Sequence, residues 1–158
     1  MATLHLVCGP VGAGKTTHAR ALAEATGGVT FCIDEWAMTL FGPELPTPLR
    51  MEWLLLRAAR CEEVIWRTSR RLLEVGVDVV LDLGFMRRAH RDLYRARAAE
   101  AGAAVRLHVV TADPEVRRER VRARNLARSG TYTIEVTDPM FDWVETCYEA
   151  PGRDEPSV

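Results

Sequence analysis

Short apolar runs alternate along this chain with longer stretches in which apolar positions recur every three or four residues. The short runs are rich in aliphatic and β-branched residues, and we predict strands there, over 3–8, 29–33, 77–83 and 104–111. The longer stretches predict helices over about 15–25, 49–74 and 88–101. This alternation indicates an α/β fold with a mainly parallel sheet of four or five strands and helices on both faces.

Turn and capping residues divide the chain further. The segment 43–48 contains three prolines, so we expect a loop before the long second helix. Asp113 and Pro114 have the types preferred at the N-cap and first position of a helix, and a final helix is expected over 137–149. We therefore predict one domain over 1–150, followed by a short C-terminal tail over 151–158.

The composition is that of a soluble globular protein. Of the 158 residues, 47% are hydrophobic and 27% charged, which suits one domain with a substantial core. No apolar run approaches the roughly 18 residues of a membrane span, and the first run leads into a glycine-rich loop, so we expect a cytoplasmic protein. The formal net charge of −1 does not suggest a broad basic surface for long nucleic acids. The four cysteines are scattered, and neither a disulfide nor a zinc site is expected.

The single lysine of this chain, among twenty arginines, marks its most specific motif. It belongs to the pattern G-x-x-x-x-G-K-[ST], which here is formed by Gly9, Pro10, Val11, Gly12, Ala13, Gly14, Lys15 and Thr16. A predicted strand precedes the pattern and a predicted helix follows it, the context in which successive backbone N–H groups surround phosphate oxygens. We predict that the loop binds ATP, that Lys15 reaches the β- and γ-phosphates, and that the Thr16 hydroxyl binds Mg²⁺.

Two aspartates follow predicted strands at the edge of the sheet where this loop lies. Asp34 follows the second strand, and Asp82 lies near the end of the third. An aspartate after a strand is ordinarily a solvated turn residue, but the carboxyl ends of parallel strands form the ligand crevice of an α/β sheet. Phosphoryl transfer also needs a carboxylate to orient or deprotonate the acceptor hydroxyl. We therefore assign both aspartates to the candidate site.

Four arginines at spacings of three, four and four residues share one side of a predicted helix. They are Arg117, Arg120, Arg124 and Arg128. A lid over about 117–134, hinged near residues 129–131, would let them close over the phosphates and exclude water. A solvated basic face balanced by nearby glutamates is the alternative, and both interpretations stay open.

Together these features resemble the small P-loop kinases related to the kinase domain of phage polynucleotide kinase and, more loosely, chloramphenicol phosphotransferase and the zeta-toxin kinases. The resemblance covers most of the chain, and it is carried by the segment 9–17, Asp34, Asp82 and the segment 124–131. It implies a three-layer P-loop fold of the AAA type with an arginine-bearing lid. It also implies ATP and Mg²⁺ as cofactors, with Mg²⁺ near Thr16 and Asp82.

The resemblance further implies roles for individual residues. The aspartate matching Asp34 is the general base of that family, and the arginines matching Arg124 and Arg128 contact the donor phosphates. We therefore expect Asp34, Lys15, Arg124 and Arg128 to be catalytic. The expected ATP-binding residues are the segment 9–17, which ends at Thr17, together with Arg120, Arg124 and Arg128.

The acceptor side departs from the polynucleotide kinase pattern. Those enzymes have an arginine three residues beyond the base, where this chain has Ala37. Asp82 is then free to hold magnesium-bound water or to meet a basic residue at Arg87, Arg88 or Arg91. The acceptor-binding candidates are Asp34, Asp82, Arg87 and Arg88.

Three functions remain under consideration. The first is an ATP- and Mg²⁺-dependent kinase that acts on a hydroxyl of a small molecule; the second is a kinase for a nucleotide or polynucleotide 5′-hydroxyl. The third is an ATP-binding switch or ATPase without a phosphoacceptor. A GTPase is not expected, because a chain with one lysine in its phosphate loop cannot contain the Asn-Lys-x-Asp signature. The C-terminal tail either borders the adenine or is a frayed end, and both interpretations stay open. The aromatic residues Trp36, Phe41 and Trp53 either line an acceptor pocket or pack in the core.

Overall fold

The computed structural model of the chain describes residues 1–130 and 132–158. Its strands are β1 (Thr3–Cys8), β2 (Val29–Cys32), β3 (Val79–Asp82) and β4 (Ala104–Val109). Its helices are α1 (Lys15–Thr26), α2 (Ile33–Phe41), α3 (Met51–Glu74), α4 (Arg88–Glu100), α5 (Pro114–Ala127) and α6 (Asp138–Cys147), with the short 3₁₀ helix η1 (Gly42–Glu44) after α2. Every predicted strand and helix is present, with ends that differ by one or two residues. Within the described ranges, none of the helices has the length and apolar character needed to cross a membrane.

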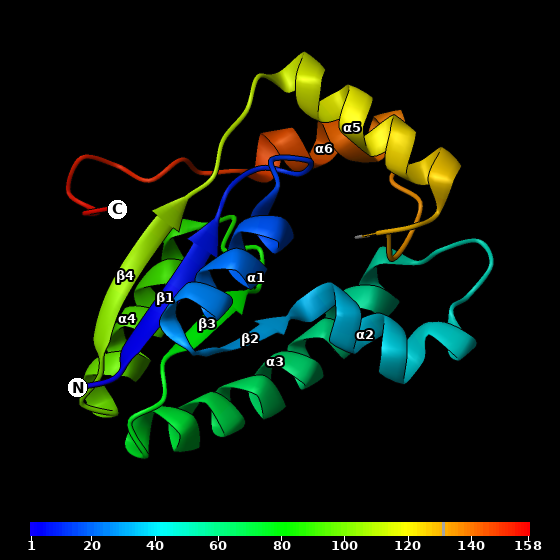
Figure 1. Cartoon of the computed structure of the whole chain (residues 1–158). Helices are drawn as coiled ribbons and strands as arrows, with labels where there is room; N and C mark the ends of the chain where they lie inside the picture. The colour runs from blue at the N-terminus through cyan, green and yellow to red at the C-terminus, as the bar shows by residue number, and fades with distance from the viewer. Residues whose placement is uncertain (131) are drawn as a thin grey trace.

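The four strands form one parallel sheet in the order β2-β3-β1-β4, which confirms the predicted α/β architecture. Leu6 of β1 lies opposite Leu81 of β3 and Leu107 of β4, and Cys32 of β2 lies opposite Asp82 of β3. In this register the carboxyl ends of the strands meet at one edge of the sheet (Figure 1). The loops that follow the strands therefore gather at a single crevice.

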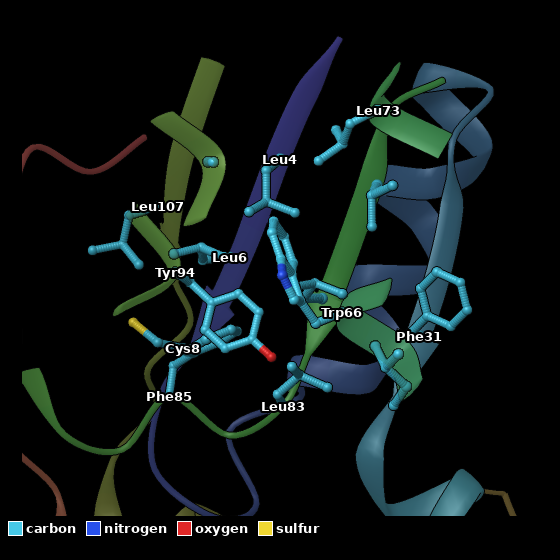
Figure 2. Close-up of a cluster of buried hydrophobic side chains, with 14 of the residues drawn as sticks. Leu4, Leu6, Cys8, Phe31, Trp66, Leu73, Leu83, Phe85, Tyr94 and Leu107 are labelled. Atoms are coloured by element: carbon cyan, nitrogen blue, oxygen red, sulfur yellow. The ribbon is translucent and has the colours of Figure 1, made fainter. Parts of the chain in front are cut away.

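Helices cover both faces of the sheet and create three layers (Figure 1). Leu4 and Leu6 of β1 point into a core cluster shared with α3 and α4, whereas Val7 packs in a smaller cluster with α1. Figure 2 shows the larger cluster, in which Trp66 on α3 and Tyr94 on α4 pack edge to face. The centres of the two rings are 5.7 Å apart. Burial on both faces explains why the strands are nearly continuous apolar runs.

Helix α2 is the main departure from the sequence prediction. Strand β2 ends at Cys32 and α2 begins at the next residue, so Asp34 lies in the first turn of a helix and not in a turn after the strand. A carboxylate is favourable there because it faces the positive end of the helix dipole. Ala37 is buried in the core cluster, and α2 packs against α3. A helix of nine residues gives too little periodicity to stand out beside a proline-rich loop.

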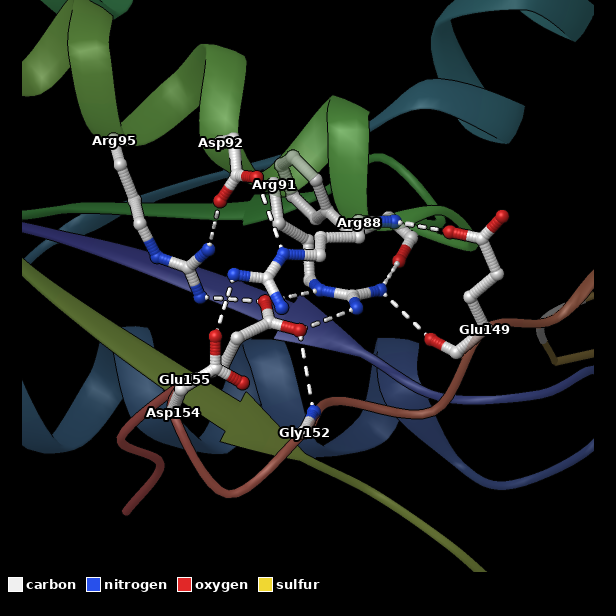
Figure 3. A network of polar contacts seen from close by, with 9 residues as sticks. Arg88, Arg91, Asp92, Arg95, Glu149, Gly152, Asp154 and Glu155 are labelled. Carbon is white, nitrogen blue, oxygen red and sulfur yellow. Dashed lines mark hydrogen bonds and ion pairs between the residues drawn. The ribbon is translucent and has the colours of Figure 1, made fainter.

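A buried ion pair holds the C-terminal segment, residues 148–158, against α4 (Figure 3). The Arg91 side chain is fully buried, and its guanidinium donates two hydrogen bonds of 2.8 Å to the Glu155 carboxylate. The same group donates to the carbonyl oxygens of Phe85 and Glu149, each at 3.0 Å. The suggestion that Arg91 meets Asp82 is therefore wrong, because the guanidinium of Arg91 is engaged by the C-terminal segment and the Phe85 carbonyl oxygen.

The last residues of the chain pair with the outer strand β4. The Val158 N–H donates to the Leu107 carbonyl at 2.8 Å, and Ser157 forms a parallel bridge with Leu107. Glu155 also accepts a hydrogen bond of 2.9 Å from Arg95. The interpretation of a frayed terminus is wrong, because backbone and side-chain contacts both fix the tail.

Removing the Glu155 charge should destabilise the fold. Glu155→Gln leaves the buried Arg91 without its counter-charge, and we expect the free energy of unfolding to fall by about 3 kcal/mol. Urea unfolding monitored by circular dichroism measures this. The matched control is Asp154→Asn, because Asp154 is exposed and its ion pair with Arg88 contributes little. Equal stability of the wild type and Glu155→Gln would show that the pair does not hold the tail.

The same pair should make stability depend on pH in a defined direction. Hydrogen bonds from Arg91 first, then from Arg95, lower the pKa of Glu155 from 4.5 to about 2. Because the folded pKa lies below the unfolded one, the stabilisation is present above pH 4.5 and is lost as the pH falls toward about 2. The difference in unfolding free energy between the wild type and Glu155→Gln should therefore be full at about pH 6 and smaller at about pH 3. A difference that stays constant over this range would contradict the assignment.

Candidate functional site

The loop between β1 and α1, residues 9–14, lies at the carboxyl edge of the sheet and carries the glycine-rich motif, whose backbone N–H groups typically form a phosphate-binding nest. A side chain at Gly9 would overlap the Val110 carbonyl oxygen, and a Cβ at Gly12 would lie 2.7 Å from the Arg117 carbonyl oxygen. Gly12 also has a φ of 76°, which favours glycine. The loop can therefore keep this path only with glycine at both positions. Helix α1 starts directly after it and adds the positive end of its dipole.

Lys15 spans this loop. Its Nζ atom donates to the Pro10 carbonyl oxygen at 3.0 Å. Partial withdrawal from water lowers the pKa of Lys15, while the negative charges of Asp82 and Asp34 act in the opposite direction. The ammonium is thus held close to two carboxylates at the mouth of the nest, where a phosphate chain can take the place of the carbonyl as its partner.

A short hydrogen bond between Thr16 and Asp82 joins α1 to β3 at the candidate site. The Thr16 hydroxyl donates to Asp82 Oδ2 at 2.6 Å, and the Asp82 side chain is buried. Mg²⁺ prefers oxygen ligands and is usually held by one or two protein oxygens together with waters and substrate phosphates. A hydroxyl and a carboxylate beside a phosphate nest fit that ion, so the residues present agree with the predicted metal position.

Asp34 lies at the same crevice, in the first turn of α2. Asp34 is exposed on one side, but neighbouring protein atoms reduce the hydration of its carboxylate. This desolvation raises the pKa of Asp34, and repulsion from Asp82 raises it further, whereas Lys15 and Arg124 act to lower it. A carboxylate whose pKa is raised is a stronger base, which suits a group that accepts a proton.

The arginines of α5 divide into two groups. Arg124 is partly buried and close enough to Asp34 and Lys15 to affect the pKa of each, and its Nε atom has no hydrogen-bond partner among the described residues. Arg120 is exposed, and Arg128 is exposed at the C-cap of α5. The segment predicted as the hinge includes Thr131, which lies outside the described residues.

Arg117 does not behave as a lid arginine, although it shares the predicted stripe. Its buried guanidinium donates two hydrogen bonds of 2.7 Å to Glu145 on α6, one of 3.1 Å to the Val11 carbonyl oxygen and one of 2.9 Å to the Ala112 carbonyl oxygen. It therefore connects the phosphate nest, the start of α5 and α6. Sequence reasoning missed Glu145, because nothing in the local pattern links it to a residue 28 positions away.

The two acceptor-binding candidates on the β3–α4 loop lie in different surroundings. Arg87 is exposed at the N-cap of α4. Arg88 donates to Asp154 at 2.6 Å, and its backbone N–H donates to Glu149 at 2.8 Å (Figure 3). The structure thus joins Arg88 to the C-terminal segment. Thr16 contacts Asp82, and the charges of Asp82, Lys15 and Arg124 act on Asp34.

The three aromatic residues considered for an acceptor pocket lie near α2. Trp36 packs edge to face on Phe31 at 5.9 Å, and Phe41 is partly buried against the core cluster. Trp53 lies on α3, where the Arg57 guanidinium stacks on its ring. Core packing thus accounts for Trp36, whereas the Arg57 guanidinium lies beside the rings of Phe41 and Trp53.

Whole-structure comparison finds similar folds among kinases. A candidate kinase from Chloroflexus aurantiacus has a TM-score of 0.75 at 18% identity, over 90% of this chain and 74% of that one. A sugar kinase from Janibacter sp. HTCC2649 has a TM-score of 0.68 at 19% identity, over 100% of this chain and 84% of that one. A chain of the Pnkp1/Rnl/Hen1 RNA repair complex has a TM-score of 0.67 at 19% identity, over 92% of this chain and 43% of that one. At these identities the similarity establishes the fold.

Sequence comparison identifies the family. A search of curated proteins gives no match. Residues 4–151 match the AAA domain family, a span that includes the phosphate nest, both aspartates and the arginines of α5. With its four parallel strands and its phosphate nest, the chain belongs to the AAA domain family and has the nucleotide-binding fold of a P-loop kinase.

Proposed function

We propose that this protein is an ATP- and Mg²⁺-dependent phosphotransferase that moves the γ-phosphate of ATP to a hydroxyl of a small-molecule acceptor. The convergence of Lys15, the Thr16–Asp82 pair, Asp34 and Arg124 at the carboxyl edge of the sheet supports this proposal. Phosphoryl transfer needs these three kinds of group: donors for the phosphate chain, oxygen ligands for magnesium and a carboxylate for the acceptor.

Each residue has a defined task in this proposal. The N–H groups of the nest and Lys15 hold the β- and γ-phosphates, while Thr16 and Asp82 would hold Mg²⁺, which neutralises charge on the phosphate oxygens. Asp34 accepts the proton of the acceptor hydroxyl while the oxygen of that hydroxyl forms a bond to the γ-phosphorus. The bond from that phosphorus to the bridging oxygen breaks, and ADP leaves with the bridging oxygen. Arg124 stabilises the negative charge on the transferring group.

A nucleotide or polynucleotide 5′-hydroxyl kinase is the second candidate, and the similarity to a chain of an RNA repair complex favours it. The internal pairing of Arg88 and Arg91 argues for a small acceptor, because it removes two cations from the groups available to a strand. Phosphate contacts to a strand would make acceptor binding fall steeply with salt. A weak salt dependence would count against a polynucleotide acceptor.

A screen of hydroxyl compounds with γ-labelled ATP tests the proposed function. We expect labelled product only with particular acceptors, and no transfer above background by the Lys15→Ala variant. ATP turnover that does not depend on any hydroxyl compound but rises with a protein partner would instead indicate an ATP-driven switch.

Neutralising the proposed base should separate catalysis from nucleotide binding. In Asp34→Asn we expect kcat to fall about a hundredfold, because the amide cannot accept the hydroxyl proton, while ATP affinity is retained. Steady-state kinetics and calorimetry measure the two quantities. Glu35→Gln is the matched control, since Glu35 is the neighbouring carboxylate and forms an exposed ion pair with Arg20. Normal turnover by Asp34→Asn would move the base elsewhere, with Asp82 as the next candidate.

The α5 arginines should differ in their effects. Arg124→Ala removes a cation near Asp34 and Lys15, and we expect kcat to fall about a hundredfold with a smaller change in ATP affinity. Arg128→Ala tests the second predicted lid residue in the same assay. Unchanged kcat in both variants would assign these arginines to a solvated surface.

A further inference from the structure

Most arginines that this fold withdraws from water have a carboxylate partner. Seven arginines are at least partly buried, and five of them pair with aspartate or glutamate: Arg91, Arg95, Arg97, Arg117 and Arg118. Arg57 and Arg124 have no such pair among the described residues. Arg124 faces the phosphate site, so Arg57 is the partly buried cation that the proposed mechanism does not use.

Neighbouring aromatic rings fix the Arg57 guanidinium in place. Its central carbon lies 3.8 Å from the centre of the Trp53 ring and 5.7 Å from that of Phe41. One terminal nitrogen donates to the Trp53 carbonyl oxygen at 3.3 Å, whereas the buried Nε atom has no hydrogen-bond partner in the part of the chain that is described. The second terminal nitrogen also has no hydrogen-bond partner among the described residues, and a guanidinium edge matches the two oxygens of a carboxylate or phosphate.

The position of Arg57 relates it to the proposed base. Phe41 follows Asp34 by seven residues on α2, so the two side chains share one side of the helix at a separation of about 10 Å along its axis. The Arg57 guanidinium approaches the Phe41 ring, so it lies beside the C-terminal end of the helix whose first turn carries Asp34.

We propose that Arg57 binds an anionic group, a carboxylate or a phosphate, of the hydroxyl acceptor. This inference rests on the proposed function and names the class of its substrate: a hydroxy acid or a phosphorylated alcohol, in preference to a neutral polyol. A partly buried guanidinium without a counter-charge is unfavourable, and an acceptor anion supplies that charge.

Matched acceptors test the preference in transfer assays with γ-labelled ATP. Gluconate and sorbitol have the same number of carbon atoms and differ in a carboxylate; a nucleoside 3′-monophosphate and its nucleoside differ in a phosphate. In at least one pair we expect the anionic member to have a kcat/KM at least about tenfold higher, since charge-assisted hydrogen bonds are strong. Arg57→Met should remove this preference, and Arg57→Lys should restore it in part.

The control variant is Arg60→Met, because Arg60 is exposed on the same helix and has no carboxylate partner among the described residues. It should leave the preference unchanged. Whichever pair shows the effect identifies the anion as carboxylate or phosphate. If the anionic member is preferred in neither pair, or Arg57→Met keeps the preference, the inference is wrong.

A direct binding measurement separates this inference from the proposed reaction. The side-chain Nε–H resonance of Arg57, assigned by its loss in Arg57→Met, should shift when gluconate or the nucleoside 3′-monophosphate is added to protein saturated with Mg²⁺ and a non-hydrolysable ATP analogue. Sorbitol and the nucleoside should not shift it. A shift, together with no phosphoryl transfer to any compound of the hydroxyl screen, would support the anion site and contradict the kinase proposal. No shift with either anion would overturn the anion site, whatever the enzyme transfers.

Discussion

The tight packing of the glycine-rich loop between β1 and α1 against its neighbours is the constraint on which the proposed phosphate site depends. The nest can present its backbone N–H groups because β1 ends directly before it and α1 begins directly after it. Neighbouring carbonyl oxygens, those of Val110 and Arg117, approach so closely that Gly9 and Gly12 cannot carry side chains. The nest is therefore packed against the segment after β4 and against α5. A shift in either of them would change the space that receives the anion.

Arginine serves both the scaffold and the proposed site, and the presence or absence of a paired carboxylate distinguishes the two uses. The ion pair of Arg91 with Glu155 fixes the C-terminal segment. The ion pair of Arg117 with Glu145 fixes α6. A guanidinium withdrawn from water needs such a partner. Arg124 on α5 and Arg57 beside α2 are partly buried and have no carboxylate partner among the described residues. We assign both of them to ligand binding. The missing counter-charges are what a phosphorylated donor and an anionic acceptor would supply.

Local sequence patterns were sufficient for the strands, most helices and the position of the glycine-rich loop between β1 and α1. The motif around Lys15 works through contiguous backbone, and the apolar strands reflect burial on both faces, so both leave signals within a few residues. The place of Asp34 at the crevice also follows from strand order, although its helix does not, because α2 is short and lies beside prolines. Asp34 as the base remains a prediction.

Contacts between distant residues were not predictable in the same way. Arg91 and Glu155 are 64 positions apart, and Arg117 and Glu145 are 28 apart, so no periodicity links the partners. Arg117 and Arg124 share one stripe of α5, and only the packing of α6 against that helix distinguishes a buried structural arginine from one at the site. Tertiary packing thus decides which members of a charged stripe remain free for a ligand.

A crystal structure with Mg²⁺ and a non-hydrolysable ATP analogue tests the central claim most directly. We expect the phosphate chain inside the nest, with Lys15 Nζ on its oxygens in place of the Pro10 carbonyl and the terminal phosphate facing Asp34. A polyphosphate bound elsewhere on the protein, or a terminal phosphate directed away from Asp34, would contradict this account of the site.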